Sequence, residues 1–159
     1  MQDSSLDAHS NRNNKVCTFE IELDMSSVIE CTNSSILTKQ SQWYSPDCSR
    51  KSYYYEAFEI KVVENRYYKI WSNSSIDTFG FLYEHQFDPL NPEKDLLDKN
   101  DDGRSDLQFQ FEIPLYNDTK YILVVTTYRP TDIGQIEIHM WGLKNVLFSR
   151  VCKLRDVVL

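Results

Sequence analysis

An acidic segment past the middle of the chain has oxygen-bearing side chains at spacings that suit a hard cation. It runs Asp98-Lys99-Asn100-Asp101-Asp102-Gly103-Arg104-Ser105-Asp106. Oxygen ligands on alternate residues, with a sharp turn at glycine, are how a loop wraps calcium. We therefore predict calcium as a cofactor, with these metal ligands: Asp98, Asn100, Asp102 and Asp106. Asp95 and Asp77 could complete the coordination shell.

Two observations limit this prediction. Phe109 stands where an EF-hand has its bidentate glutamate, and the flanking residues alternate like strands, so the segment is not an EF-hand. A solvated acidic turn between two strands is the alternative. Asp77 precedes a threonine, a position at which aspartate often bonds only its own backbone.

No catalytic constellation is visible. The three histidines, His9, His85 and His139, lie far apart and lack metal-ligand spacing. The sequence contains no Gly-x-Ser-x-Gly, His-Glu-x-x-His or P-loop motif. We therefore predict that the protein is not an enzyme.

Cysteines and sequons favour an extracellular location. The four cysteines, Cys17, Cys31, Cys48 and Cys152, form no CxxC pair, which argues against zinc or redox motifs. They allow two disulfides in three pairings, or buried thiols instead. Three Asn-x-Ser/Thr sequons, at Asn33, Asn73 and Asn117, predict glycosylation at positions expected in loops. The first 15 residues have no apolar signal region, so secretion implies a fragment or a misassigned start.

Charge and hydropathy exclude two classes of partner. The chain carries 24 acidic and 17 basic residues, a formal net charge of -7, and its basic residues are scattered. Such a surface repels nucleic acid. No run of 18 apolar residues is present, so we predict no membrane span.

The apolar pattern predicts one all-β domain, an antiparallel β-sandwich or jelly-roll-like fold. Aromatic residues make up 13% of the 159 residues, and strands favour them. Period-two alternation predicts strands over 16–24, 53–62, 67–71, 78–84, 107–113 and 136–140, with 53–73 a hairpin. Residues 121–128 are apolar on both faces, which predicts a central strand.

The remaining segments divide the chain as follows. Residues 1–15 are predicted to be a disordered polar lead-in, and 16–52 to hold N-terminal strands and loops that a disulfide could tie. Residues 53–142 form the main sandwich, with a long polar loop at 86–106. Residues 143–159 are a tail with a further strand.

A family resemblance rests on an ordered set of motifs. These are YYYEAFEI (53–60), SIDTFGFLY (75–83), LLD (96–98), NDDG (100–103), Phe109, YILVVTT (121–127) and Gly134. In this order they resemble the bacterial pre-peptidase C-terminal (PPC) domain, and more closely its copies in secreted repeat proteins. The resemblance covers a little over half of the chain. It implies a non-catalytic, jelly-roll-like sandwich, appended to secreted enzymes or repeated in tandem. It also implies that calcium, collagen or carbohydrate are possible ligands.

Seven aromatic residues could form a platform on which sugars stack. The candidates are Trp43, Tyr44, Tyr53, Tyr55, Tyr67, Trp71 and Trp141. Their faces suit stacking on sugar rings. Packing in the core and across strands is the alternative that we favour for each of them.

These observations lead to a ranked set of functions. The first is a non-catalytic extracellular binding or adhesion module, stabilised by calcium, that contacts a glycan, matrix or extracellular protein. The second is an accessory or spacer domain that aids the folding or secretion of a secreted enzyme. The third is a glycan-active enzyme. If the chain is a fragment, tandem neighbouring domains are expected partners.

Overall fold

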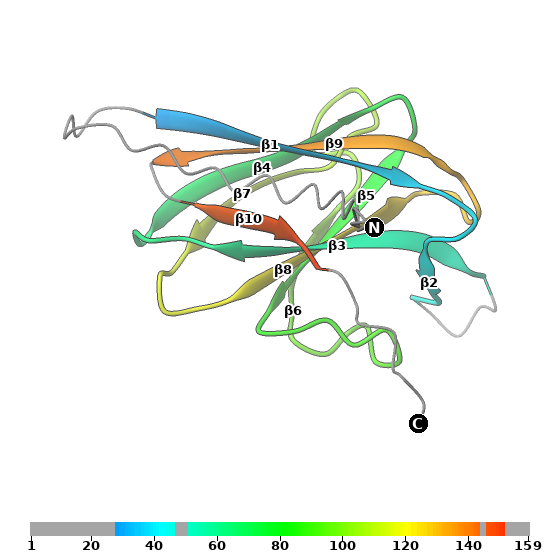
Figure 1. The fold of residues 1–159 in the computed structure, drawn as a ribbon, viewed down its shortest axis with the longest axis horizontal. Coiled ribbons are helices and arrows are strands. Elements are labelled where there is room, and N and C mark those ends of the chain that lie inside the picture. The colour runs from blue at the N-terminus through cyan, green and yellow to red at the C-terminus, as the bar shows by residue number, and fades with distance from the viewer. Residues whose placement is uncertain (1–27, 47–50, 144–145, 152–159) are drawn as a thin grey trace, which may run out of the picture.

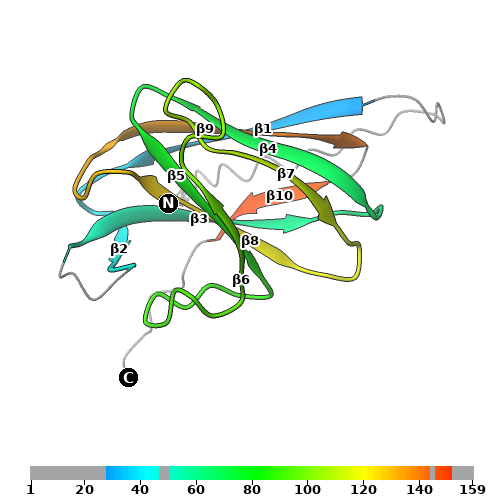
Figure 2. The same cartoon turned by 180° about the vertical axis from the view of Figure 1, so that it is seen from behind.

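The protein is a β-sandwich of two antiparallel sheets (Figures 1 and 2). The structure is a computed structural model, and it describes residues 28–46, 51–143 and 146–151. No helix occurs among these residues. The predicted all-β sandwich is therefore confirmed.

The smaller sheet has four strands. Their order is β1 (Val28–Leu37), β9 (Gly134–Leu143), β4 (Arg66–Ser74) and β7 (Gln110–Leu115). In Figure 1 this sheet forms the upper layer. Alternate residues of β9, Ile136, Ile138 and Met140, are buried against the other sheet, as their period-two pattern predicts.

The larger sheet has six strands. The path runs β10 (Leu147–Arg150), β3 (Tyr53–Lys61), β8 (Tyr121–Thr127), β5 (Thr78–Glu84) and β6 (Leu96–Asn100). The short strand β2 (Gln42–Tyr44) pairs with the first three residues of β3, whereas β10 pairs with Phe58–Lys61. Glu56 and Ala57 thus lie between these two pairings.

The space between the sheets is filled by apolar side chains from both layers. The largest fully buried members include Phe58, Ile60, Tyr68, Phe109 and Phe111. β8 is buried along its whole length between β3 and β5, so the predicted central strand is confirmed. β1 and β10 complete the two sheets.

Two predictions about the connections are wrong. Residues 53–73 do not form a hairpin, because β3 and β4 belong to different sheets and the turn between them crosses the sandwich. Both strands bury apolar residues in the same interior, Phe58 on β3 and Ile70 on β4, which an arch achieves as well as a hairpin. The polar segment 86–106 is not a loop throughout, since β6 pairs with β5 within it. The predicted strand 16–24 lies outside the described residues.

Candidate functional site

The outer face of the six-stranded sheet carries a second buried cluster, which we call the aromatic cluster. Its buried members are Tyr44, Tyr55, Phe81, Tyr83, Ile122 and Val124, with Phe87 packed against them. They come from the outward positions of β3, β5 and β8, from β2, and from the loop after β5. Tyr44, Tyr55 and Phe87 meet edge to face, with ring centroids 5.2–5.4 Å apart.

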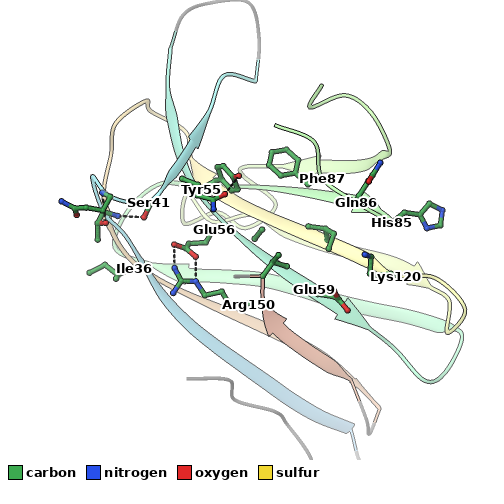
Figure 3. Close-up of a pocket in the computed structure, with 16 residues that line it drawn as sticks. Ile36, Ser41, Tyr55, Glu56, Glu59, His85, Gln86, Phe87, Lys120 and Arg150 are labelled. Carbon is green, nitrogen blue, oxygen red and sulfur yellow. Dashed lines mark hydrogen bonds and ion pairs between the residues drawn. The ribbon is translucent and has the colours of Figure 1, made fainter. Parts of the chain in front are cut away.

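Beside this cluster lies a groove of about 630 Å³ (Figure 3). Tyr55, Ala57 and Ile122 contribute apolar surface from β3 and β8, and Phe87 adds a ring from the β5–β6 loop. The rest of the described lining comes from the end of β1 and the turn to β2, from the end of β10, from the segment after β5 and from the residue before β8. A concave surface with a partly apolar lining and a few polar groups is typical of a ligand site.

An ion pair fixes one part of the groove. Glu56 is 6% exposed, and both of its carboxylate oxygens accept hydrogen bonds from Arg150. The Nε–Oε2 distance is 2.5 Å and the Nη2–Oε1 distance is 2.6 Å (Figure 3). This bidentate geometry orients the guanidinium group, whose side chain is about half exposed. The charge of Glu56 is compensated, and Arg150 is held in place at the groove.

Neutral hydrogen-bonding groups also line the groove. The Tyr55 hydroxyl donates to Gln42 Oε1 at 2.6 Å. Burial, and secondarily the charge of Glu56, raises the pKa of Tyr55, so its hydroxyl stays protonated. Gln40 and Gln86 add further amides to the lining. Each amide offers donors and acceptors together.

The ionisable side chains of the groove's described lining include His85, Lys120 and two carboxylates. The carboxylates are those of Glu56 and Glu59. Glu56 is bound by Arg150, and Glu59 lies 2.8 Å from the Lys61 ammonium. Each of the two carboxylates therefore has a cationic partner.

The predicted metal ligands do not converge. Asp98 Oδ1 accepts a hydrogen bond from the Lys99 amide at 2.8 Å, and Asp106 pairs with Arg104 at 3.3 Å. Asn100 Oδ1 accepts from two backbone amides, those of Gly103 at 2.7 Å and Gln110 at 3.0 Å, and so ties the loop. Asp102 is exposed. Among the described residues no group of three His, Cys, Asp or Glu could hold a metal. Calcium stays a prediction.

The two supplementary metal candidates lie apart. Asp95 precedes β6, and its carbonyl accepts from the Glu84 amide at 2.9 Å. Asp77 lies between β4 and β5, and its Oδ1 is buried without a hydrogen-bond partner among the described residues. Burial is the main cause that raises the pKa of Asp77, followed by Asp102 and Asp101 from the loop after β6, with Arg129 opposing. Carboxylates from several loops thus gather at this end of the sandwich.

Three of the four cysteines lie outside the described part of the chain. Cys31 is buried on β1, opposite Met140 of β9. Cys17, Cys48 and Cys152 lie outside the described residues. The predicted disulfides stay predictions.

All three sequons were predicted to lie in loops, but two of them lie in strands. Asn33 lies within β1, is 8% exposed, and donates through Nδ2 to the Phe148 carbonyl at 3.5 Å. Asn73 lies on β4 and is exposed, and Asn117 is exposed in the turn before β8. The loop assignment was wrong for Asn33 and Asn73, because pairing with β9 draws both polar segments into strands. A glycan on Asn33 would be attached to the same Nδ2 atom that makes this contact.

The seven aromatic candidates do not form one platform. Tyr44 and Tyr55 belong to the aromatic cluster, as the packing interpretation predicts. Trp71 stacks on His139 across the four-stranded sheet, at 5.1 Å with a 9° interplanar angle. Trp43, Tyr67 and Trp141 are exposed, on strands β2, β4 and β9. Tyr53 packs at the border of the aromatic cluster.

Sequence reasoning missed the Glu56–Arg150 pair and the groove. One signal was available: Glu56 stands in a register otherwise occupied by Tyr54, Phe58 and Ile60. A carboxylate in an inward-facing apolar register needs a partner. That partner, Arg150, lies 94 residues away in the sequence.

Within the part of the chain that the structure describes, no helix is long and apolar enough to cross a membrane. Neither a protein-family model nor a curated protein sequence matches the chain.

Proposed function

We propose that the chain is a non-catalytic extracellular binding module whose groove, at the edge of the six-stranded sheet where β3 lies between β2 and β10 and beside the aromatic cluster, binds a glycan. One observation carries this proposal. The groove combines apolar and aromatic surface, from Tyr55, Phe87 and Ile122, with neutral polar groups and a fixed guanidinium. This combination matches the two kinds of surface on a sugar ring.

The chemistry of the lining favours a sugar over an apolar ligand. A sugar presents an apolar ring face, which packs on an aromatic side chain, and hydroxyls that both donate and accept. The side-chain amides of Gln40, Gln42 and Gln86 can accept hydrogen bonds from sugar hydroxyls and donate to them. A purely apolar ligand would leave these amides unpaired.

The other predicted properties stay part of this proposal. The sandwich agrees with the architecture that the PPC resemblance implies, and the sequons at Asn73 and Asn117 are exposed, as an extracellular glycoprotein requires. An accessory domain of a secreted enzyme, with neighbouring domains in tandem, is the second candidate. A groove that binds no saccharide or protein would favour that candidate.

A glycan array tests the proposal. We expect the chain to retain a defined set of glycans, and Gln42→Ala and Gln86→Ala to weaken that binding about tenfold in titrations of the best one. Tyr67→Ala, on the opposite sheet, is the matched control and should bind normally. Retention of no glycan, or equal binding by the groove variants and the wild type, would refute the proposal.

A further inference from the structure

A second hollow lies on the same face as the groove, beyond the aromatic cluster. It has a volume of about 540 Å³ and lies between β2, β3, β5, β6 and the loop after β8. Its aromatic lining consists of Tyr44, Tyr53, Phe79 and Phe81. Phe79 and Phe81 are stacked, with centroids 4.4 Å apart and a 21° interplanar angle. The hollow thus offers flat aromatic surface to a ring.

The charges around this hollow have the opposite sign to the protein as a whole. Lys51, Lys99 and Arg129 line it and are exposed, whereas Glu93 is the one carboxylate among its described lining residues. Among the described residues, none of the three cations forms an ion pair. In a chain of net charge -7, this is a local excess of positive charge. Such a concentration of unpaired cations attracts an anionic ligand.

An unsatisfied buried group adds an independent observation. Tyr44 lines the hollow and is 2% exposed, and its hydroxyl has no hydrogen-bond partner among the described residues. Burying a hydroxyl without a partner costs stability, so such groups are rare in folded proteins. Burial raises the pKa of Tyr44, so this hydroxyl remains a neutral donor. A ligand oxygen that reaches Tyr44 would supply the missing acceptor.

We infer that this hollow is a second binding site, separate from the groove, for an anionic saccharide that carries a carboxylate or a sulfate. The sugar ring packs on Phe79, Phe81 and Tyr53. Its anionic group lies among Lys51, Lys99 and Arg129, and one of its oxygens accepts from Tyr44. The groove holds a compensated Glu56–Arg150 pair instead, so the two sites differ in charge.

Isothermal titration calorimetry with four probes tests this inference. The probes are a sulfated heparin hexasaccharide, an oligogalacturonate, neutral maltohexaose and inorganic sulfate. We expect one or both anionic saccharides to bind, more weakly as salt rises, and neither maltohexaose nor sulfate to bind comparably. Binding of the heparin probe alone identifies the sulfate as the recognised group, and binding of the oligogalacturonate alone identifies the carboxylate.

Variants locate the site. Lys99→Gln with Arg129→Gln should lower the affinity for the anionic probe tenfold or more. Tyr44→Phe should lower it several-fold while the protein stays folded, as checked by circular dichroism. The matched control, Arg66→Gln with Lys69→Gln, removes two cations from the opposite sheet and should leave the affinity unchanged.

Three results would overturn the inference. They are no binding of either anionic saccharide, equal binding of inorganic sulfate, and an equal loss of affinity in the control. The groove variant Gln42→Ala separates this inference from the proposed function. It should leave anionic binding intact, so that either site can fail while the other is confirmed.

Discussion

The two outer faces of the sandwich are built differently. On the six-stranded sheet, β2 and the loop between β5 and β6 cover the middle of the face and bury the aromatic cluster. The groove and the second hollow lie on either side of this cover. On the four-stranded sheet, Tyr67 and Trp141 are 74% and 50% exposed. A sheet face that is only partly covered acquires hollows with aromatic walls.

The four-stranded face is organised by charge instead. The His139 ring lies between two glutamates, with Nδ1 2.6 Å from Glu30 and Nε2 2.7 Å from Glu137, the second without hydrogen-bond geometry. Lys69 lies 3.6 Å from Glu112 and 5.9 Å from the centre of the Trp71 ring.

This side also has a depression, of about 710 Å³. Its lining consists mainly of serine, asparagine and glutamine, with no aromatic side chain. Of these three hollows, the two with aromatic walls therefore lie on the six-stranded side.

The largest expected effect comes from removing a ring of the aromatic cluster. Tyr83 is fully buried and donates a hydrogen bond to the Pro92 carbonyl, so Tyr83→Ala should lower the free energy of unfolding by about 3–5 kcal/mol. Tyr67→Ala on the opposite face should change it by less than about 0.5 kcal/mol. Urea unfolding measures both. Equal effects would mean that the cluster is not a packed layer.

The second-largest difference is expected in how much stability is lost when an ion pair on each side of the sandwich is broken. Arg150→Gln leaves the buried carboxylate of Glu56 without its cationic partner and should cost about 3 kcal/mol, since an uncompensated buried charge is expensive. Glu112→Gln breaks an exposed pair with Lys69 and should cost less than about 1 kcal/mol. The same unfolding experiment compares them, and an Arg150→Gln cost no larger than the control would contradict the account.

Alkaline pH should loosen the six-stranded side. Burial raises the pKa values of Tyr44, Tyr55 and Tyr83, and that of Tyr68 in the interior. A folded-state pKa above the unfolded value of about 10 means that stability is complete below that pH and falls as pH rises through it. The loss should approach about 1.4 kcal/mol per pH unit for each tyrosine.

Thermal melting between pH 8 and pH 11 measures this loss. The triple variant Tyr44→Phe, Tyr55→Phe and Tyr83→Phe should show only the part of the alkaline loss of stability that Tyr68 causes. A variant that loses stability as steeply as the wild type would show that the aromatic cluster does not cause the pH dependence.

The smallest effect is expected where the loops join the two sheets. The raised pKa of Asp77 means that its charge destabilises the folded state at neutral pH, so Asp77→Asn should stabilise by up to about 0.5 kcal/mol. The gain should vanish below about pH 3, where Asp77 is protonated in both states. Calcium that raises the melting temperature of the wild type, but not of the variant, would support the predicted cofactor.

The strands could be predicted from sequence because alternation reports directly on burial. Residues 121–128 and 136–140 behave as their pattern indicates. Sheet membership could not be predicted, because an arch and a hairpin bury Phe58 and Ile70 equally well. The groove could not be predicted either. It depends on contacts between β3 and β10, and on a loop that places Phe87 over the outer face, and neither leaves a local periodicity.

Chemical-shift mapping by NMR tests the central claim, that ligands bind on the six-stranded side, most directly. Backbone amides would be followed while the best glycan from the array is titrated into the isotope-labelled chain. The account predicts that the shifts concentrate at Gln42, Ala57 and Ile122, at the groove. Shifts concentrated at Thr32, His139 and Trp141, on the four-stranded face, would contradict it.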